Sequence, residues 1–469
     1  MSILVGATSA CAGAAGQTSA DLGDTISQSL RFSGSKLTGS TVSTSTWTCS
    51  FWIKFAVGDG SGYIFSAGND AGVTTNGNQL YMNNDADSVR GRLSFDNGIE
   101  LATRRLRDPN AWYHIVGNYN GSVLNYWVNN ESLDTLSGVA GTGHSGTFVI
   151  GGTPNTGDAS CWDAINLAEF HYIDGTVLTP SSFGRTNNDG VWVPKSLSSL
   201  TSDQYGADGF RLVFDSSANG GIGDDSAPTG GNHSSANDFT ATGFDTAAIS
   251  SSNEDNDIDY NDTPTNNYAV LNPLNVFDAS VTYSKANLRA NYGGSGNRVV
   301  FVDMPMDDGK YYWECTLKDQ VEAWVGVITE DYEKRQITIF SDNSDGWAYD
   351  MSGSTDNQKN HNGSSSSSHG ATVAGDTIGF LLDIPSGTLK IEINGATQSN
   401  SEFTNIPTNE RLFVAFNIGG ASGNVNMDWN FGQMAFQHEP TGYQHVATNS
   451  LPEPTIKNGS DHFQAITDT

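Results

Sequence analysis

Short runs in which apolar and polar residues alternate recur along most of this 469-residue chain. In the clearest run, residues 309–317, large apolar side chains occupy every second position from Tyr311 to Leu317. This period predicts a strand with one face in a core, because successive strand side chains point to opposite faces. A second such run, residues 321–329, follows after three residues. The two runs are therefore predicted to pair as antiparallel neighbours.

Similar runs lie on both sides of a long polar stretch, and Asn-Gly, Asp-Gly or Asn-Asn pairs separate many of them. The composition agrees with this pattern, since 53 glycines and only 16% charged residues suit short strands joined by polar turns. No window shows a sustained helical period with caps. The chain is therefore predicted to be all-β, with antiparallel sandwiches. The runs are residues 45–55, 62–68, 91–97, 112–120, 123–130, 146–152, 165–174, 209–217, 378–382, 389–393, 412–418 and 425–431.

The length and the polar stretch together predict two sandwich domains rather than one. Small residues dominate the beginning of the chain and cannot build a core, so they are expected to dock on a partner. The predicted organisation is an N-terminal docking arm (1–28), a first sandwich (29–217), an Asn/Ser/Gly-rich linker (218–267), a second sandwich (268–437) and a C-terminal tail (438–469).

The net charge of −30 argues against a nucleic-acid partner, because such binding depends on cationic contacts to phosphate. No apolar run approaches the roughly 20 residues that a membrane span needs, so no membrane partner is expected. The charge fits solubility through mutual repulsion, or else cation binding by clustered carboxylates. No metal site is predicted, but calcium is the cofactor that polar loops 67–72, 82–88 and 155–160 could hold if they are more than plain turns.

The four cysteines, Cys11, Cys49, Cys161 and Cys315, lie far apart and form no CxxC motif. Cys49 and Cys315 fall inside strand patterns, where a free thiol behaves as a small core residue. The thiols are expected to be reduced, as in a chain that folds in a cytoplasm. A bridge between Cys49 and Cys161 stays open at this point.

The sequence predicts no catalytic residues. A retaining glycosidase needs two carboxylates about 5–5.5 Å apart, which on one strand face means acidic residues at alternating positions. The acidic runs 253–262 and 330–333 do not alternate on an aromatic-flanked strand. No GxSxG elbow and no HExxH motif is present. Binding is therefore predicted in preference to catalysis.

The candidate ligand-binding residues lie in a long polar insertion, residues 341–371. Trp347 and Tyr349 are predicted as an exposed pair that stacks on sugar rings, with Asp350 and His361 beside them. The alternative is that the two aromatic side chains cap the edge of the sandwich. By strand parity, Trp47, Trp112, Trp313 and Trp429 are predicted to be core, and the other candidates for exposure are Trp52, Trp127, Trp162 and Trp324.

The run at 309–329 resembles the opening of a SPRY (B30.2-like) domain, with a Gly-Lys-aromatic-Trp-Glu strand and then a Val-Gly-Val strand. Residues 375–395 and 411–436 resemble the rest of that pattern. The resemblance implies a β-sandwich used for recognition, without catalytic machinery, whose loops carry specificity. The earlier strands, with SFWIKF and the hairpin at 112–128, resemble a laminin-G-like, concanavalin-type jelly roll.

Residues 168–195, AEFHYIDGTVLTPSSFGRTNNDGVWVPK, resemble a segment common in structural proteins of tailed bacteriophages, particularly marine ones. Further strings resemble the same family, at residues 209–217, 237–244, 262–274 and 451–463. The resemblance implies a virion protein made in the host cytoplasm.

The expected function is that of a tail fibre or receptor-binding adhesin that holds host surface polysaccharide without covalent chemistry. A homo-oligomer would add avidity, and the N-terminal arm would contact other virion proteins. One alternative is a head-decoration or tail-assembly protein without a receptor. A polysaccharide depolymerase is the other, and it needs a catalytic site that the sequence does not show.

Overall fold

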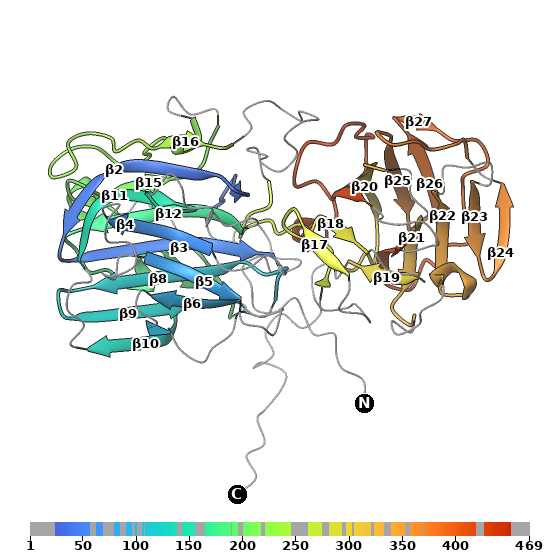
Figure 1. The fold of residues 1–469 in the computed structure, drawn as a ribbon. Coiled ribbons are helices and arrows are strands. Elements are labelled where there is room, and N and C mark those ends of the chain that lie inside the picture. Colours follow the sequence, from blue (N-terminus) through green and yellow to red (C-terminus); the bar gives the residue numbers. More distant parts are fainter. Residues whose placement is uncertain are drawn as a thin grey trace, which may run out of the picture. The chain divides into compact units, whose positions relative to one another are not determined.

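The structure, a computed structural model, is built almost wholly of antiparallel strands, which confirms the predicted all-β class (Figure 1). The chain divides into two compact units, and it passes from the first to the second between Asn267 and Tyr268. The described residues are 24–56, 62–68, 79–84, 91–95, 99–100, 106, 108–137, 143–154, 165–188, 190–195, 200–216, 221–244, 261–273, 281–292, 297–302, 304–319, 323–332, 339–351, 357–367, 369–418 and 426–451.

The first sandwich has one sheet built from β1 (Leu30–Phe32), β3 (Trp47–Phe55), β8 (Tyr113–Tyr119), β9 (Val123–Val128), β10 (Glu131–Ser137), β12 (Ile165–Asp174) and β15 (Phe210–Leu212). Its order is β1-β12-β3-β8-β9-β10, and β15 also pairs with β12. The other sheet contains β2 (Lys36–Thr44), β4 (Gly62–Gly68), β5 (Gln79–Asn84), β6 (Gly91–Phe95), β7 (Ile99–Glu100), β11 (His144–Ile150) and β16 (Thr240–Thr242). Its order is β16-β2-β11-β4-β5-β6-β7.

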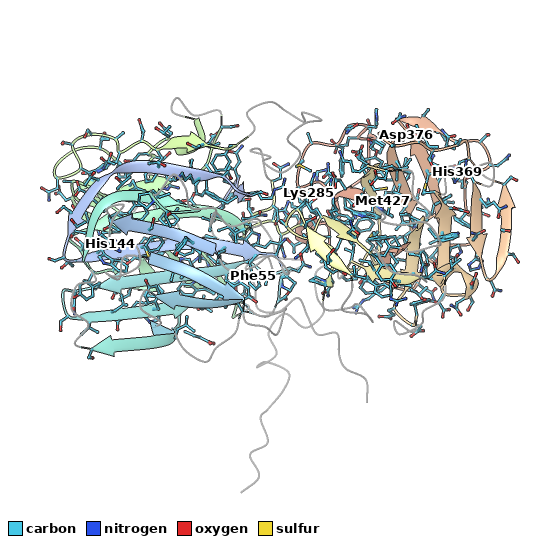
Figure 2. The ribbon with its side chains drawn as sticks, in the orientation of Figure 1. Phe55, His144, Lys285, His369, Asp376 and Met427 are labelled. Atoms are coloured by element: carbon cyan, nitrogen blue, oxygen red, sulfur yellow. The ribbon has the colours of Figure 1, made fainter. Side chains whose placement is uncertain are left out.

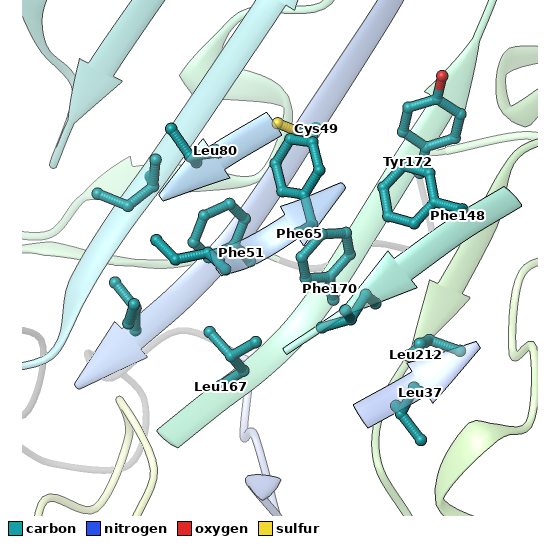
Figure 3. Close-up of a cluster of buried hydrophobic side chains, with 14 of the residues drawn as sticks. Leu37, Cys49, Phe51, Phe65, Leu80, Phe148, Leu167, Phe170, Tyr172 and Leu212 are labelled. Carbon is teal, nitrogen blue, oxygen red and sulfur yellow. The ribbon is translucent and has the colours of Figure 1, made fainter. Parts of the chain in front are cut away.

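Stacked aromatic rings fill the space between these two sheets (Figure 3). Phe51 and Phe170 stack with centroids 5.1 Å apart, and Phe65 stacks on Phe148 at 5.3 Å. The predicted inward face of β3 is confirmed, since Trp47, Cys49, Phe51 and Ile53 are fully buried. Cys49 is a free thiol of this core, and burial raises its pKa to about 12.

The opposite face of β3 is covered as well, because Thr48, Ser50, Trp52 and Lys54 are also buried. Trp52, predicted as a candidate for exposure, instead packs in a cluster with Ile26, Trp112, Ala168 and Trp192. Strand alternation marks which residues share a face, but it does not show whether later parts of the chain cover that face.

The covering layer comes mainly from residues 175–195 and the residues that follow them. It contains η2 (Pro180–Ser182), β13 (Gly184–Thr186), β14 (Trp192–Pro194) and α1 (Ser202–Tyr205). The side chains of Phe183, Leu200 and Tyr205 pack in one cluster with Val116 and Ile173 of the main sheet.

Residues predicted as arm and linker also contact the first sandwich. Ile26, in the predicted arm, packs in one cluster with Trp52 and Trp112 of the first sandwich. In the predicted linker, β16 pairs with β2, and the Phe239 ring packs edge-on against Phe210 with centroids 4.6 Å apart. The polar composition of these residues did not predict such contacts, because the contacts depend on a few buried side chains and many hydrogen bonds.

The second sandwich has one sheet built from β17 (Thr282–Ser284), β18 (Arg289–Asn291), β20 (Lys310–Leu317), β25 (Thr377–Asp383), β26 (Thr388–Ile393), β27 (Ala396–Thr397) and β29 (Met427–Asn430). Its order is β17-β18-β29-β20-β25-β26-β27. The other sheet contains β19 (Arg298–Phe301), β21 (Ala323–Thr329), β22 (Gly346–Asp350), β23 (Gln358–His361), β24 (Ser364–Ser367) and β28 (Leu412–Ile418). Its order is β19-β28-β21-β22-β23-β24.

The predicted hairpin between β20 and β21 is wrong, because the two strands lie in different sheets. β20 pairs with β25 and β29, whereas β21 pairs with β22 and β28. A short connection between two alternating runs looks the same whether the chain turns within a sheet or crosses to the facing one. The predicted turn at 383–388 is confirmed, with Leu382 opposite Leu389 and Gly387 at a φ of 65°.

The predicted core face of β20 is confirmed, since Tyr311, Trp313, Cys315 and Leu317 are all buried. The free thiol of Cys315 lies in this core, and Cys11 and Cys161 fall outside the described residues. No helix in the described part of the chain is long and apolar enough to cross a membrane.

The other face of β20 carries a buried carboxylate, Glu314, that holds part of the predicted tail. Its oxygens accept hydrogen bonds from the amides of Gln437 (2.9 Å) and His438 (2.8 Å) and from the Tyr312 hydroxyl (2.8 Å). Further along, the Gln444 amide donates to Lys310 O at 2.8 Å. Residues 437–451 thus pack on the second sandwich.

His144 is a buried titratable group in the core of the first sandwich (Figure 2). Its ring stacks on Trp47 with centroids 4.4 Å apart, and Nδ1 lies 2.9 Å from the Tyr172 hydroxyl. Among the described residues, Nε2 has no hydrogen-bond partner. Burial lowers the pKa of His144 to about 3, because a charged ring in this core would lose its hydration.

Acid should therefore destabilise the first sandwich well above the pH at which carboxylates protonate. The ring is neutral in both states above pH 6.5, and below it only the unfolded chain gains a proton until about pH 3. The free energy of unfolding should fall by about 1.4 kcal/mol per pH unit for this one group between pH 6 and 4. Denaturant titrations at several pH values give the free energy of unfolding as a function of pH. The slope of this plot should be smaller by that amount in His144→Gln than in the parent. The exposed neighbour change Ser145→Ala should keep the parental slope, and equal slopes in parent and His144→Gln would contradict the assignment.

Candidate functional site

The predicted ligand-binding residues lie inside the second sandwich rather than on its surface. Trp347 and Tyr349, both on β22, are 4% and 0% exposed, so the predicted exposed pair is wrong. Asp350 is buried at 9% exposure, and His361 on β23 is half-buried. The sequence could not show that later residues close over these aromatic side chains.

Trp347 and His361 support one edge of the sheet. Their rings stack with centroids 4.5 Å apart and 10° between the planes. The Trp347 indole donates to Asn405 Oδ1 at 3.1 Å, and His361 Nδ1 donates to Gly346 O at 2.9 Å. These contacts join β22 and β23 to the chain segment that follows β27.

The Tyr349 hydroxyl also holds the segment that follows β27. It donates toward the carbonyl oxygens of Leu389 (2.7 Å) and Ser401 (2.6 Å). Its ring contacts Phe403, whose amide and carbonyl pair with Leu389. Tyr349 thereby fixes the course of residues 398–404 against β26.

An open groove of about 560 Å³ lies beside these contacts, between the edges of the two sheets of the second sandwich. One wall is the β23–β24 hairpin, within the predicted insertion. The other wall is β26, β27 and residues 398–404. We call this the edge groove, and it is lined by Lys359, Ser366, Ser367, Lys390, Thr397, Gln398, Asn400, Ser401, Glu402 and Thr404.

The edge groove presents hydroxyl, amide and ammonium groups and one carboxylate. Lys359 Nζ donates to the backbone oxygen of Glu402 at 2.5 Å and lies 5.4 Å from the centroid of the Phe403 ring. Within the described ranges, neither Lys359 nor Lys390 has a carboxylate oxygen within 4.0 Å. Such a mixture can donate to and accept from many hydroxyl groups at once.

Most of the residues that line the edge groove carry no recognisable signal in the sequence. Only Lys359, Ser366 and Ser367 fall in the predicted insertion, and the remainder follow from the pairing of β26 with β27 and the return of residues 398–404. The polar run between Asn394 and Glu402 is the one hint, and it is shared with ordinary turns.

A smaller cavity of about 90 Å³ lies in the first sandwich under the covering layer. Its wall includes Ser50, His114, Glu169, His171 and Arg211. These are residue types used in hydrolysis, so their geometry decides what they can do.

In the Ser50–His114 pair, the hydrogen bond runs in the wrong direction for a serine nucleophile and its general base. The Trp192 indole N–H donates to His114 Nδ1 at 3.0 Å, so the neutral ring carries its proton on Nε2. That Nε2–H then points to Ser50 Oγ, 2.8 Å away, and cannot accept the serine proton. Burial, helped by His171, lowers the pKa of His114 to about 3, which keeps the ring neutral.

Glu169 sits at a bulge in β12 with a left-handed φ of 48°. Its carboxylate receives two hydrogen bonds from the Arg211 guanidinium, each 3.0 Å long, and lies 3.3 Å from His171 Nε2. Burial alone would raise the pKa of Glu169, but hydrogen bonding from His171 and the Arg211 charge lower it. A carboxylate held ionised in this way is unsuited to act as the general acid of a glycosidase.

Metal ligands are not grouped in the part of the chain that the structure describes. No set of three His, Cys, Asp or Glu side chains there could hold a metal ion. The central residues of the candidate calcium loops 67–72, 82–88 and 155–160 lie outside the described residues.

Comparison with protein families agrees with the two sandwiches. Residues 31–181 match the model of the Concanavalin A-like lectin/glucanases superfamily, and residues 310–434 match the SPRY domain model. The chain contains a concanavalin-like jelly roll followed by a SPRY domain. No curated protein matches the chain.

Solved structures similar to part of the chain include the SPRY domain of human HERC1, at 17% identity and a TM-score of 0.28 over 35% of this chain and 99% of that one. The TRIM65 PSpry domain has 19% identity and a TM-score of 0.29 over 35% and 92%. The stonustoxin structure has 21% identity and a TM-score of 0.29 over 35% of this chain and 27% of the toxin chain.

Removing the Tyr349 hydroxyl should loosen the edge groove without unfolding the sandwich. In Tyr349→Phe the carbonyls of Leu389 and Ser401 lose a buried donor, which should cost about 1–3 kcal/mol of unfolding free energy. Amide hydrogen exchange should accelerate in residues 398–404 more than in β20 or β25. Tyr443→Phe, a change at a half-buried tyrosine of the same sandwich, should leave both measurements unchanged. Equal exchange in the two variants would show that Tyr349 does not hold the groove.

Proposed function

We propose that this chain is a tailed-bacteriophage virion protein that serves as a receptor-binding adhesin for host surface polysaccharide. The observation that carries the proposal is the edge groove, an open polar concavity on a rigid support. The support consists of Trp347, Tyr349 and His361, whose side chains are held in place by hydrogen bonds to Asn405 and to backbone oxygens. The phage assignment rests on the ordered strings that resemble phage structural proteins, from residues 168–195 onward.

The groove suits a hydroxyl-rich chain for a chemical reason. A polysaccharide offers rows of hydroxyl groups that both donate and accept, and the groove offers both in return. Lys359 and Lys390 donate, the Glu402 carboxylate accepts, and the Gln398 and Asn400 amides do both. Its open form admits the side of a long chain rather than a single sugar.

Binding in the proposed mechanism is non-covalent. In the cavity of the first sandwich, polar side chains pair with one another, as the Ser50–His114 and Glu169–Arg211 pairs illustrate. A single shallow groove would bind weakly, so several copies in a homo-oligomer would supply avidity. Residues 1–23 are proposed to contact other virion proteins, since the described part of the predicted arm, from Asp24, packs on the first sandwich.

Binding of the purified chain to host cells and to a panel of host surface polysaccharides would test this proposal. Lys390→Met and Lys359→Met should each weaken polysaccharide binding at least about tenfold, because each removes a charged donor from the groove. Lys36→Met, a matched change in the first sandwich, should bind as the parent does.

The absence of binding to host cells and polysaccharides would contradict the adhesin proposal and favour a head-decoration or tail-assembly role. Binding that both groove variants retain at full strength would move the receptor site elsewhere on the chain. Release of oligosaccharides from the polysaccharide would instead indicate a depolymerase.

A further inference from the structure

The phage-like string that begins at Asp262 is not used by the edge groove, and its first part returns to the first sandwich. We call residues 261–267 the clasp segment. Asp262 is fully buried, and its Oδ2 lies 2.6 Å from Lys54 Nζ, which is 4% exposed. The Trp112 indole donates to Asp262 Oδ1 at 3.0 Å, and the Ser29 hydroxyl donates to Asp262 O at 2.6 Å. The carboxylate therefore has a fitted charged and polar site.

The rest of the clasp segment is held at equally specific positions. Thr265 Oγ1 accepts from the Ile26 amide at 3.1 Å and donates to Ile26 O at 3.0 Å. Asn267 Oδ1 accepts from Lys54 Nζ at 2.7 Å, and its Nδ2 donates to Asn110 O at 2.7 Å. These contacts all lead to the outer face of the first sandwich, which we call the clasp groove.

The clasp segment also has a shape of its own. Thr263 and Asn266 exchange two backbone hydrogen bonds of 3.1 Å, which closes a tight turn over Pro264 and Thr265. Proline at the second position favours such a turn, because its ring fixes φ. A peptide that is shaped before it binds loses less conformational entropy on binding.

The groove needs its ligand for an electrostatic reason. Without Asp262, the Lys54 ammonium would remain on a covered sheet face beside Trp52 and Trp112. A buried charge that loses its partner is strongly destabilising. The clasp segment thus resembles a bound ligand that is held by one charged residue, Asp262, and two neutral ones, Thr265 and Asn267.

We propose that the outer face of the first sandwich is a peptide-binding groove whose ligand is the chain's own segment 261–267. The covalent connection through residues 245–260 is then unnecessary for holding the clasp segment in place. A chain cleaved within 245–260 keeps the second sandwich attached, because residue 267 is joined directly to Tyr268. In the proposed virion protein, this binding keeps the two fragments together after the chain is cut within residues 245–260.

The test uses the full chain with a recognition sequence for a site-specific protease inserted after Ser251. After complete cleavage under native conditions, the two fragments should elute together at the position of the uncut chain. Asp262→Asn should raise the dissociation constant of the cut fragments about 100-fold, because it removes the charge that pairs with Lys54. Asp331→Asn, a change at an exposed aspartate of the second sandwich, should leave it unchanged.

Thr265→Val gives a second variant in case Asp262→Asn does not fold, and it should weaken the cut complex about tenfold through the lost bonds to Ile26. An excess of a synthetic peptide spanning residues 259–268 should speed fragment separation, whereas a scrambled peptide should not. Fragments that separate on cleavage at micromolar concentration would overturn the proposal. Fragments that stay together equally well in parent, Asp262→Asn and Thr265→Val would also overturn it.

Discussion

Burial of both faces of the central strands is the constraint on which the rest of this structure depends. β3 and β20 each carry an aromatic face in a sandwich core. The second face is covered along the whole of β3 and at Tyr312 and Glu314 of β20. The second faces bear polar groups such as Lys54 and Glu314, which must find partners once water is excluded. Asp262 pairs with Lys54, and the amides of Gln437 and His438 pair with Glu314. Segments of low apolar content are thereby tied to the sandwiches.

This constraint also determines where binding can take place. The covered faces are occupied by fitted pairs, and the cavity beside Ser50 and Glu169 has its hydrogen-bonding groups committed to neighbouring side chains. The edge groove is different, because its polar side chains line an open concavity of about 560 Å³. The buried aromatic side chains of β22 and β23 act as its support. This open edge is where we propose that polysaccharide is recognised.

The sequence could predict the strands and their core faces, because alternation in runs such as Tyr311–Leu317 reports burial on one face directly. It could not predict strand partners: β20 and β21 are separated by only five residues and still lie in different sheets. It also placed Trp347 and Tyr349 on the surface, because the residues that cover them, near Ser401 and Asn405, come from a distant part of the chain. For the same reason the Lys54–Asp262 pair, which joins residues far apart in sequence, left no local pattern.

Hydrogen exchange of the full chain, with and without host surface polysaccharide, tests the central claim most directly. Recognition at the edge groove predicts slower exchange in residues 357–367 and 389–404 when polysaccharide is bound. It also predicts unchanged exchange around Ser50 and Glu169 and a polysaccharide of unaltered length. Protection centred on the cavity of the first sandwich, or shortening of the polysaccharide during the measurement, would contradict the account.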